Sequence, residues 1–62
     1  MSWRTGGRIF IRIWPIIKEE IDDKEERKQF VKNLLDLFIM YDVDQYDLEG
    51  IDSELDNIIE KL

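Results

Sequence analysis

Carboxylates are the groups in this chain with the clearest capacity for chemistry, and seven of them lie between residues 42 and 56. Such a cluster can bind calcium when its oxygens occupy positions 1, 3, 5 and 12 of a loop that has glycine at position 6. A loop that starts at Asp42 places Tyr46 at position 5 and Ser53 at position 12, and a loop with Gly50 at position 6 starts at a glutamine. Neither register fits, so we expect no bound metal and no other cofactor.

The same stretch, which we call the acidic loop, could instead contact a basic surface on another protein. A small, acidic, cysteine-free helical protein can occlude such a surface, including one that normally holds DNA. The simpler interpretation is that the carboxylates keep a small protein in solution and cap its helices, and both interpretations stay open. The candidate partner-binding residues of the acidic loop are Asp42, Asp44, Asp47, Glu49, Asp52, Glu54 and Asp56.

Most forms of catalysis are excluded by what the chain lacks. It has no histidine and no cysteine, which removes serine–histidine and cysteine nucleophiles, disulfides and ordinary zinc sites. The pair Gly6-Gly7 alone is a very weak signal for a phosphate-binding loop. A chain of 62 residues has little room for a deep pocket in which carboxylate pKa values could be shifted. We therefore predict that the protein is not an enzyme.

The element that organises the rest of the chain is a predicted helix over residues 24–41, with Asp22 or Asp23 as its cap. Its apolar side chains span an arc of roughly 200°, whereas a surface helix that covers one core needs a stripe of a little over 100°. Such a face must be buried on two sides by its own chain, or partly by a partner. We predict a homodimer to which this face contributes, with the self-association residues Leu35, Phe38 and Ile39.

Residues 8–21 admit two interpretations. As a strand, isoleucines alternate with charged and aromatic residues, and the segment would have to pair across a dimer because no second strand candidate exists. As a helix, its apolar residues fill an arc of about 160° with arginines opposite. We favour a helix over residues 7–21, capped by Thr5 and kinked at Pro15, since proline removes one internal hydrogen bond.

A last helix is predicted over residues 53–61, where apolar residues recur at helical spacing after a cap at Asp52 or Ser53. The chain is too short for more than one domain. We therefore expect a single all-α domain over residues 1–62. Its architecture is a small three-helix bundle whose helices cover about residues 7–21, 24–41 and 53–61.

Charge is distributed unevenly, because residues 1–18 carry +4 and residues 33–62 carry −8 within a net charge of −6. The two ends should attract, within one chain or between antiparallel partners. The basic start also suits a membrane surface or nucleic acid, since it contains Trp3, Arg4, Arg8 and Arg12. The excess of acids opposes nucleic-acid binding, and an ordinary core helix explains the segment more simply. We identify no secretory signal or membrane span and expect a cytoplasmic protein.

Several short motifs resemble those of small uncharacterised bacteriophage proteins. These motifs are Ser2-Trp3, Gly6-Gly7 before an amphipathic segment with Pro15, Arg27, Leu37-Phe38 before Tyr41-Asp42-Val43-Asp44, and Gly50-Ile51-Asp52. The resemblance carries no established activity, but it implies an accessory protein, including one that blocks a bacterial defence system. We therefore predict a small acidic protein-binding module of phage or mobile-element origin that inhibits a host protein. The alternatives are a structural or assembly protein that acts by self-association, and membrane-surface or nucleic-acid binding through the basic N-terminus.

Overall fold

The computed structural model describes residues 2–62, and all regular secondary structure in that range is helical. The helices α1 (Arg4–Glu20), α2 (Lys24–Met40) and α3 (Ser53–Glu60) follow in that order, with a short 3-10 helix, η1 (Gln45–Leu48), before α3. The predicted all-α three-helix bundle is therefore confirmed. Residues 8–14 are helical, and Pro15 lies inside α1.

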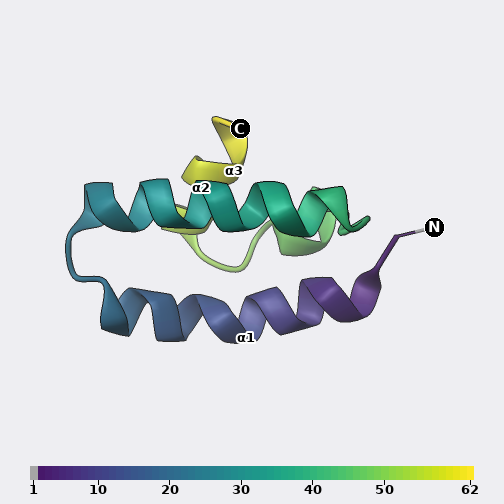
Figure 1. The fold of residues 1–62 in the computed structure, drawn as a ribbon, viewed down its shortest axis with the longest axis horizontal. Coiled ribbons are helices and arrows are strands. Elements are labelled where there is room, and N and C mark those ends of the chain that lie inside the picture. Colours follow the sequence, from purple (N-terminus) through teal and green to yellow (C-terminus); the bar gives the residue numbers. More distant parts are fainter. Residues whose placement is uncertain (1) are drawn as a thin grey trace.

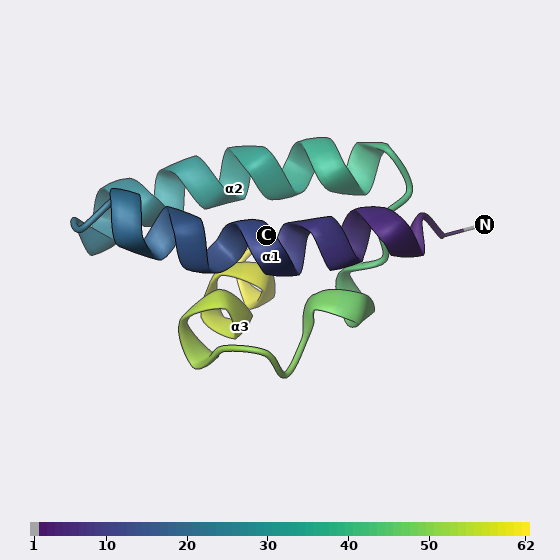
Figure 2. The same cartoon turned by 90° about the horizontal axis from the view of Figure 1, so that it is seen from below.

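The helices form two layers. α1 and α2 lie side by side and antiparallel, as a hairpin that turns at residues 21–23 (Figure 1). In the perpendicular view, η1 and α3 lie together against one side of this hairpin (Figure 2). Within the part of the chain that the structure describes, no helix covers the opposite side.

Aspartates start α2 and α3, as predicted. The Asp23 carboxylate accepts hydrogen bonds from the backbone N–H groups of Glu25 at 2.9 Å and Glu26 at 3.3 Å. The Asp52 carboxylate accepts one from the N–H of Glu54 at 2.8 Å. Both side chains satisfy donors that the first helical turn leaves free.

The start of α1 differs from the prediction. The helix begins at Arg4, and Thr5, the predicted cap, lies inside it. Trp3 occupies the cap position without a side-chain hydrogen bond. Its backbone N–H instead donates to the Asp42 carbonyl at 2.6 Å, so a contact with the end of α2 fixes the start of α1 in place of a local cap.

The end of α2 is closed by a left-handed residue. Asp42 has a φ of 72°, its N–H donates to the Ile39 carbonyl, and the N–H of Val43 donates to the Phe38 carbonyl. This is the Schellman arrangement, in which glycine usually occupies the left-handed position. Val43 is buried directly after it, so the turn also directs the chain back into the core.

A single hydrophobic core lies between the hairpin and the η1–α3 layer, and every element contributes to it. Ten apolar residues are buried there: Phe10, Trp14, Ile17, Val31, Leu35, Val43, Leu48, Leu55, Ile58 and Ile59. The core therefore fills one side of the hairpin, and no described element covers the other side of α1 and α2 (Figure 2).

Candidate functional site

The acidic loop does not converge on one site, because four of its seven carboxylates have structural partners. Asp44 accepts a hydrogen bond from the N–H of Tyr46, and Asp56 accepts one from the N–H of Gly50. Asp52 and Glu54 form ion pairs with α1 and α2, as described next. Among residues 2–62, no group of three or more acidic side chains is arranged to hold a metal ion.

Asp52 is tied to α1 by Lys18, whose Nζ lies 2.9 Å from the Asp52 carboxylate. The hydrogen bond from Lys18 lowers the pKa of Asp52 to about 2. The Lys18 amine also lies 5.7 Å from the centre of the Trp14 ring, a distance suited to a cation–π contact. These contacts explain why Asp52 is a fixed part of the fold and not a free carboxylate.

Glu54 is held even more firmly, by Arg27 of α2. The Arg27 Nε donates to one Glu54 oxygen at 2.6 Å and Nη2 donates to the other at 2.8 Å. The third donor, Nη1, reaches the Ile21 carbonyl at 2.7 Å. The hydrogen bond from Arg27 lowers the pKa of Glu54 and raises that of Arg27. Both charges are therefore already paired within the chain.

Three carboxylates of the acidic loop, those of Asp42, Asp47 and Glu49, are exposed and make no side-chain hydrogen bond within residues 2–62. They come from the end of α2, from η1 and from the residue that follows η1. These three differ from the other four predicted partner-binding residues, whose carboxylates each accept a hydrogen bond within the chain.

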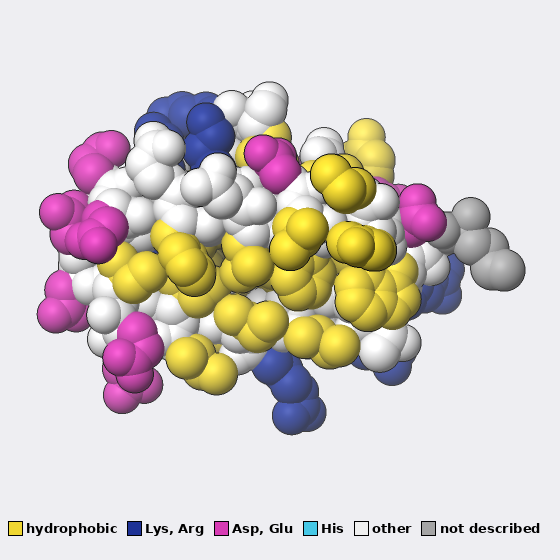
Figure 3. All heavy atoms as spheres, in the orientation of Figure 1, with side chains coloured by type: hydrophobic (Ala, Val, Ile, Leu, Met, Phe, Trp, Pro, Cys, Tyr) yellow, Lys and Arg dark blue, Asp and Glu magenta, His cyan; other side chains and the backbone are white. Residues whose placement is uncertain are grey.

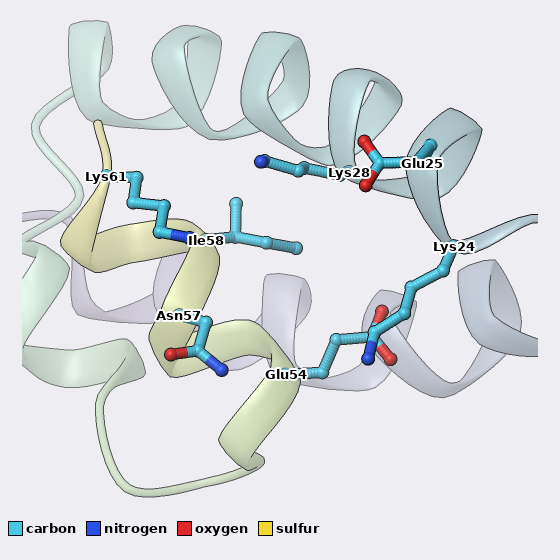
Figure 4. Close-up of a pocket in the computed structure, with 7 residues that line it drawn as sticks. All are labelled: Lys24, Glu25, Lys28, Glu54, Asn57, Ile58 and Lys61. Atoms are coloured by element: carbon cyan, nitrogen blue, oxygen red, sulfur yellow. The ribbon is translucent and has the colours of Figure 1, made fainter.

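A hollow also lies between α2 and α3. It has a volume of about 240 Å³ and is lined mainly by lysine and glutamate side chains, including Lys24, Lys28 and Lys61 (Figure 4). Lys24 and Lys61 are exposed and Lys28 is partly buried, and the Glu54 carboxylate at the edge of the hollow is paired with Arg27. The lining of the hollow is therefore mainly charged and combines lysine amines with carboxylates.

The predicted self-association residues occupy three different environments. Leu35 is fully buried in the core of its own chain, so its side chain is not accessible to a second copy. Phe38 is partly buried. Its ring packs edge-on against the Phe10 ring, with 5.3 Å between the ring centres, and stacks on the Trp3 ring, with 6.0 Å between the centres. Ile39 is also partly buried. The covered part of α2 is therefore the part that we assigned to the dimer.

A larger apolar surface lies on the hairpin side that faces away from α3, and we call it the outer face. α1 contributes residues spaced by four and three, and α2 contributes residues spaced by four, three and four. Such spacing keeps side chains on one side of a helix. The outer face consists of Trp3, Ile9, Ile13, Ile16, Phe30, Leu34, Leu37 and Tyr41.

The outer face lies on the side of α1 and α2 that is turned away from η1 and α3. Residues on the other side of each helix contact α3 or the residue before it. Lys18 of α1 pairs with Asp52, and Lys28 of α2 lines the hollow beside Ile58. The space-filling view shows hydrophobic side chains in a continuous band along the seam between α1 and α2 (Figure 3). At one end of the outer face, Trp3, Leu37, Phe38 and Tyr41 line an apolar hollow of about 290 Å³.

Much of the outer face is exposed to solvent. Six large side chains, those of Trp3, Ile9, Ile16, Phe30, Leu37 and Tyr41, are each between 41% and 63% exposed. Large contiguous apolar patches on a small protein generally mark interaction sites. Sequence reasoning missed this surface because the wide arc of α2 did not show which part its own chain would cover.

Two further observations bear on function. Among the described residues, no helix combines the length and apolar character that crossing a bilayer requires. No protein-family model matches the chain, and comparison with curated proteins and with solved structures reveals no similar protein.

Proposed function

We propose that this chain is a non-enzymatic protein-binding module whose docking surface is the outer face. The observation that carries the proposal is the band of six exposed apolar side chains on two adjacent helices. Aromatic side chains such as Trp3, Phe30 and Tyr41 are enriched at protein interfaces, because they bury a large area at a small cost in conformational entropy. A rigid hairpin presents them without any need to order a loop.

The specific role that we propose is that of an accessory protein of phage or mobile-element origin that inhibits a host protein. This part of the proposal depends on the resemblance in sequence motifs, and the fold adds a surface through which such a protein could act. The exposed carboxylates of Asp42, Asp47 and Glu49 supply a second contact for a partner with a basic surface. They lie at and after the end of α2, away from the middle of the outer face.

The experiment uses a photo-reactive benzoylphenylalanine in place of Tyr41 on the outer face, in cells that produce the full chain. Illumination should give a covalent adduct with a protein chain. A matched probe at Glu60, which is exposed on α3, should give none. A probe at Glu49 tests the acidic loop in the same way. Adducts at Tyr41 that contain only lipid, or no adduct at Tyr41, would overturn the proposal.

A further inference from the structure

We infer that the occupant of the outer face is a second copy of this chain, packed antiparallel so that the two hairpins form a four-helix bundle. The inference rests on the proposed function, since it names the partner of the same surface. It goes further by fixing the direction of packing and the residues that meet.

The spacing of the outer face is that of a coiled-coil seam. Ile9, Ile13 and Ile16 follow each other at four and three residues, as do Phe30, Leu34, Leu37 and Tyr41 with a further step of four. Apolar residues at alternating steps of four and three pack as knobs into holes between facing helices. Two such seams on neighbouring antiparallel helices are what one half of a four-helix bundle presents to the other half.

The register of α1 against α2 defines the middle of the outer face. Phe10 packs on Phe38 near one end of the hairpin, and Arg27 reaches the Ile21 carbonyl near the other end. The middle of the α2 seam lies between Leu35 and Asp36. By the same register, that level on α1 falls between Arg12 and Ile13.

A two-fold axis at this level, perpendicular to the helices, pairs the outer face with itself. On α2, Phe30 then meets Tyr41 of the second copy, and Leu34 meets Leu37 of the second copy. On α1, Ile9 meets Ile16 of the second copy, and Ile13 meets its own equivalent. Each of these seven side chains thus packs against another apolar one, and the pairing is the same from either copy, as an isologous interface requires.

A second symmetric dimer is possible, with its two-fold axis along the helices. The distribution of charge favours the perpendicular axis over this alternative. The hairpin turn is strongly acidic, and acidic side chains gather at that end in the space-filling view (Figure 3). The opposite half of α1 carries only positive charge, on Arg4, Arg8 and Arg12. An axis along the helices would place the two acidic turns together. The perpendicular axis instead brings Glu19 to within two residues of the level of Arg8 of the second copy.

The size of the surface is sufficient for a stable dimer. A specific interface buries about 800 Å² on each partner, roughly a sixth of the 4554 Å² that the chain exposes. The longest two dimensions of the molecule are 35 and 21 Å, so one broad side has about this area. A membrane surface fits less well, because anionic lipids would repel the acidic turn.

The absence of cysteine allows a direct test of this packing by single-cysteine variants of the full chain. Under mild oxidation, Ile13→Cys should form a disulfide-linked dimer by itself, since position 13 is the outer-face position of α1 that lies next to the axis. Ile9→Cys and Ile16→Cys should link to each other when mixed and link poorly alone. If Ile13→Cys links to Leu34→Cys in preference to itself, the axis runs along the helices and the inference fails.

Solution mass provides the second measurement. The 7.5 kDa chain should sediment at about twice that mass in the micromolar range, and Leu37→Glu on the outer face should sediment as a monomer with unchanged helicity. Tyr46→Glu, at an exposed residue of η1 on the other side of the hairpin, is the matched control and should stay dimeric. A wild-type monomer throughout this range overturns the inference.

These outcomes separate the inference from the proposed function. If the probe at Tyr41 captures a different protein while the chain stays monomeric, the proposed function holds and the second copy is excluded. A third measurement is binding of the chain to vesicles of phosphatidylserine and phosphatidylcholine. Binding to them that is lost in Leu37→Glu and kept in Tyr46→Glu would overturn both.

Discussion

Arg27 and Glu54 form a two-pronged ion pair that joins α2 to α3, with hydrogen bonds of 2.6 and 2.8 Å. The same guanidinium donates to the Ile21 carbonyl at the end of α1. Arg27 is the only buried charged residue among residues 2–62. One side chain therefore fixes the relative positions of all three α-helices.

Substitution of one partner of this pair should destabilise the fold strongly. Glu54→Gln leaves the Arg27 guanidinium in place without a counter-charge, and an uncompensated buried charge is costly. We expect the melting temperature to fall by on the order of 10 °C, measured by circular dichroism. Arg27→Lys should also lower it, because an ammonium cannot make the two parallel hydrogen bonds.

The double variant Arg27→Met/Glu54→Leu is the control for this prediction. It removes both charges and fills the space with apolar groups, and such replacements are often neutral or stabilising. We expect it to melt near the wild-type temperature. Equal melting temperatures for Glu54→Gln and wild type would show that the pair contributes nothing to the positions of the helices.

Acid should weaken the fold within a defined range of pH. The pKa of Asp52 is lowered from 3.8 to about 2 by Lys18, and that of Glu54 is lowered by Arg27. Because folding depresses both pKa values, their contribution is complete only above about pH 5, beyond the ordinary pKa values of both groups, and is lost as the pH falls toward 2. For Asp52 we expect a loss of about 1 kcal/mol, since the Lys18 side chain is 39% exposed and water screens the pair.

Asp52→Asn tests the origin of this pH dependence. Asparagine keeps the capping ability of the residue but has no proton to gain. Urea unfolding of this variant should show a shallower loss of stability between pH 4 and pH 2, with the remaining slope due to Glu54. An unchanged slope would exclude the Lys18–Asp52 pair as a source of the effect.

Two adjacent glycines of α1 should respond differently to alanine. At Gly7, an added Cβ would lie 3.5 Å from its nearest neighbour, which is ordinary contact. Gly7→Ala should therefore stabilise the helix by about 0.5–1 kcal/mol. At Gly6, an added Cβ would collide with the Trp3 indole ring, so Gly6→Ala should gain no stability and should displace Trp3 from Phe38.

Tryptophan fluorescence separates the two glycine variants. Trp14 is buried and should be unaffected, so any added quenching by acrylamide reports Trp3. We expect greater quenching in Gly6→Ala than in Gly7→Ala. The opposite order would mean that the indole does not rest on Gly6.

The sequence predicted features that depend on local chemistry and missed those that depend on distant contacts. Asp23 and Asp52 were predictable caps, because a carboxylate bonds to the N–H groups of the next turn. The start of α1 was not, because it depends on the hydrogen bond from Trp3 to Asp42. The loop pattern predicts that Glu54 binds a partner. In the structure its carboxylate is bound by Arg27, which lies 27 residues earlier in the sequence.

The outer face could be predicted from the sequence only in part, for the same reason. The wide apolar arc of α2 correctly indicated more surface than one core could cover. The arc alone could not show that α3 and α1 would cover Leu35 and leave Phe30, Leu37 and Tyr41 exposed. Which residues of α2 are covered depends on the side of α2 against which the other helices pack, and no local sequence pattern encodes that side.

Asp42→Gly should increase stability. Asp42 has a φ of 72° at the end of α2, a conformation that glycine adopts without the steric cost of a Cβ. We expect a gain of about 0.5–1 kcal/mol in urea unfolding. Gly50→Ala is the matched opposite, because Gly50 has a φ of 81° and an added Cβ there would meet nothing within 4 Å. It should lose about 1 kcal/mol through backbone strain alone.

The Asp42→Gly variant also tests whether the Asp42 carboxylate has a role in binding or only in the fold. If the acidic loop contacts a basic partner, Asp42→Gly should fold more stably and yet give fewer photo-adducts from the Glu49 probe. If the carboxylate serves only to close α2, stability should rise and the adducts should not change. A fall in stability would contradict both, since it would mean that the Asp42 side chain makes a stabilising contact that outweighs its left-handed backbone.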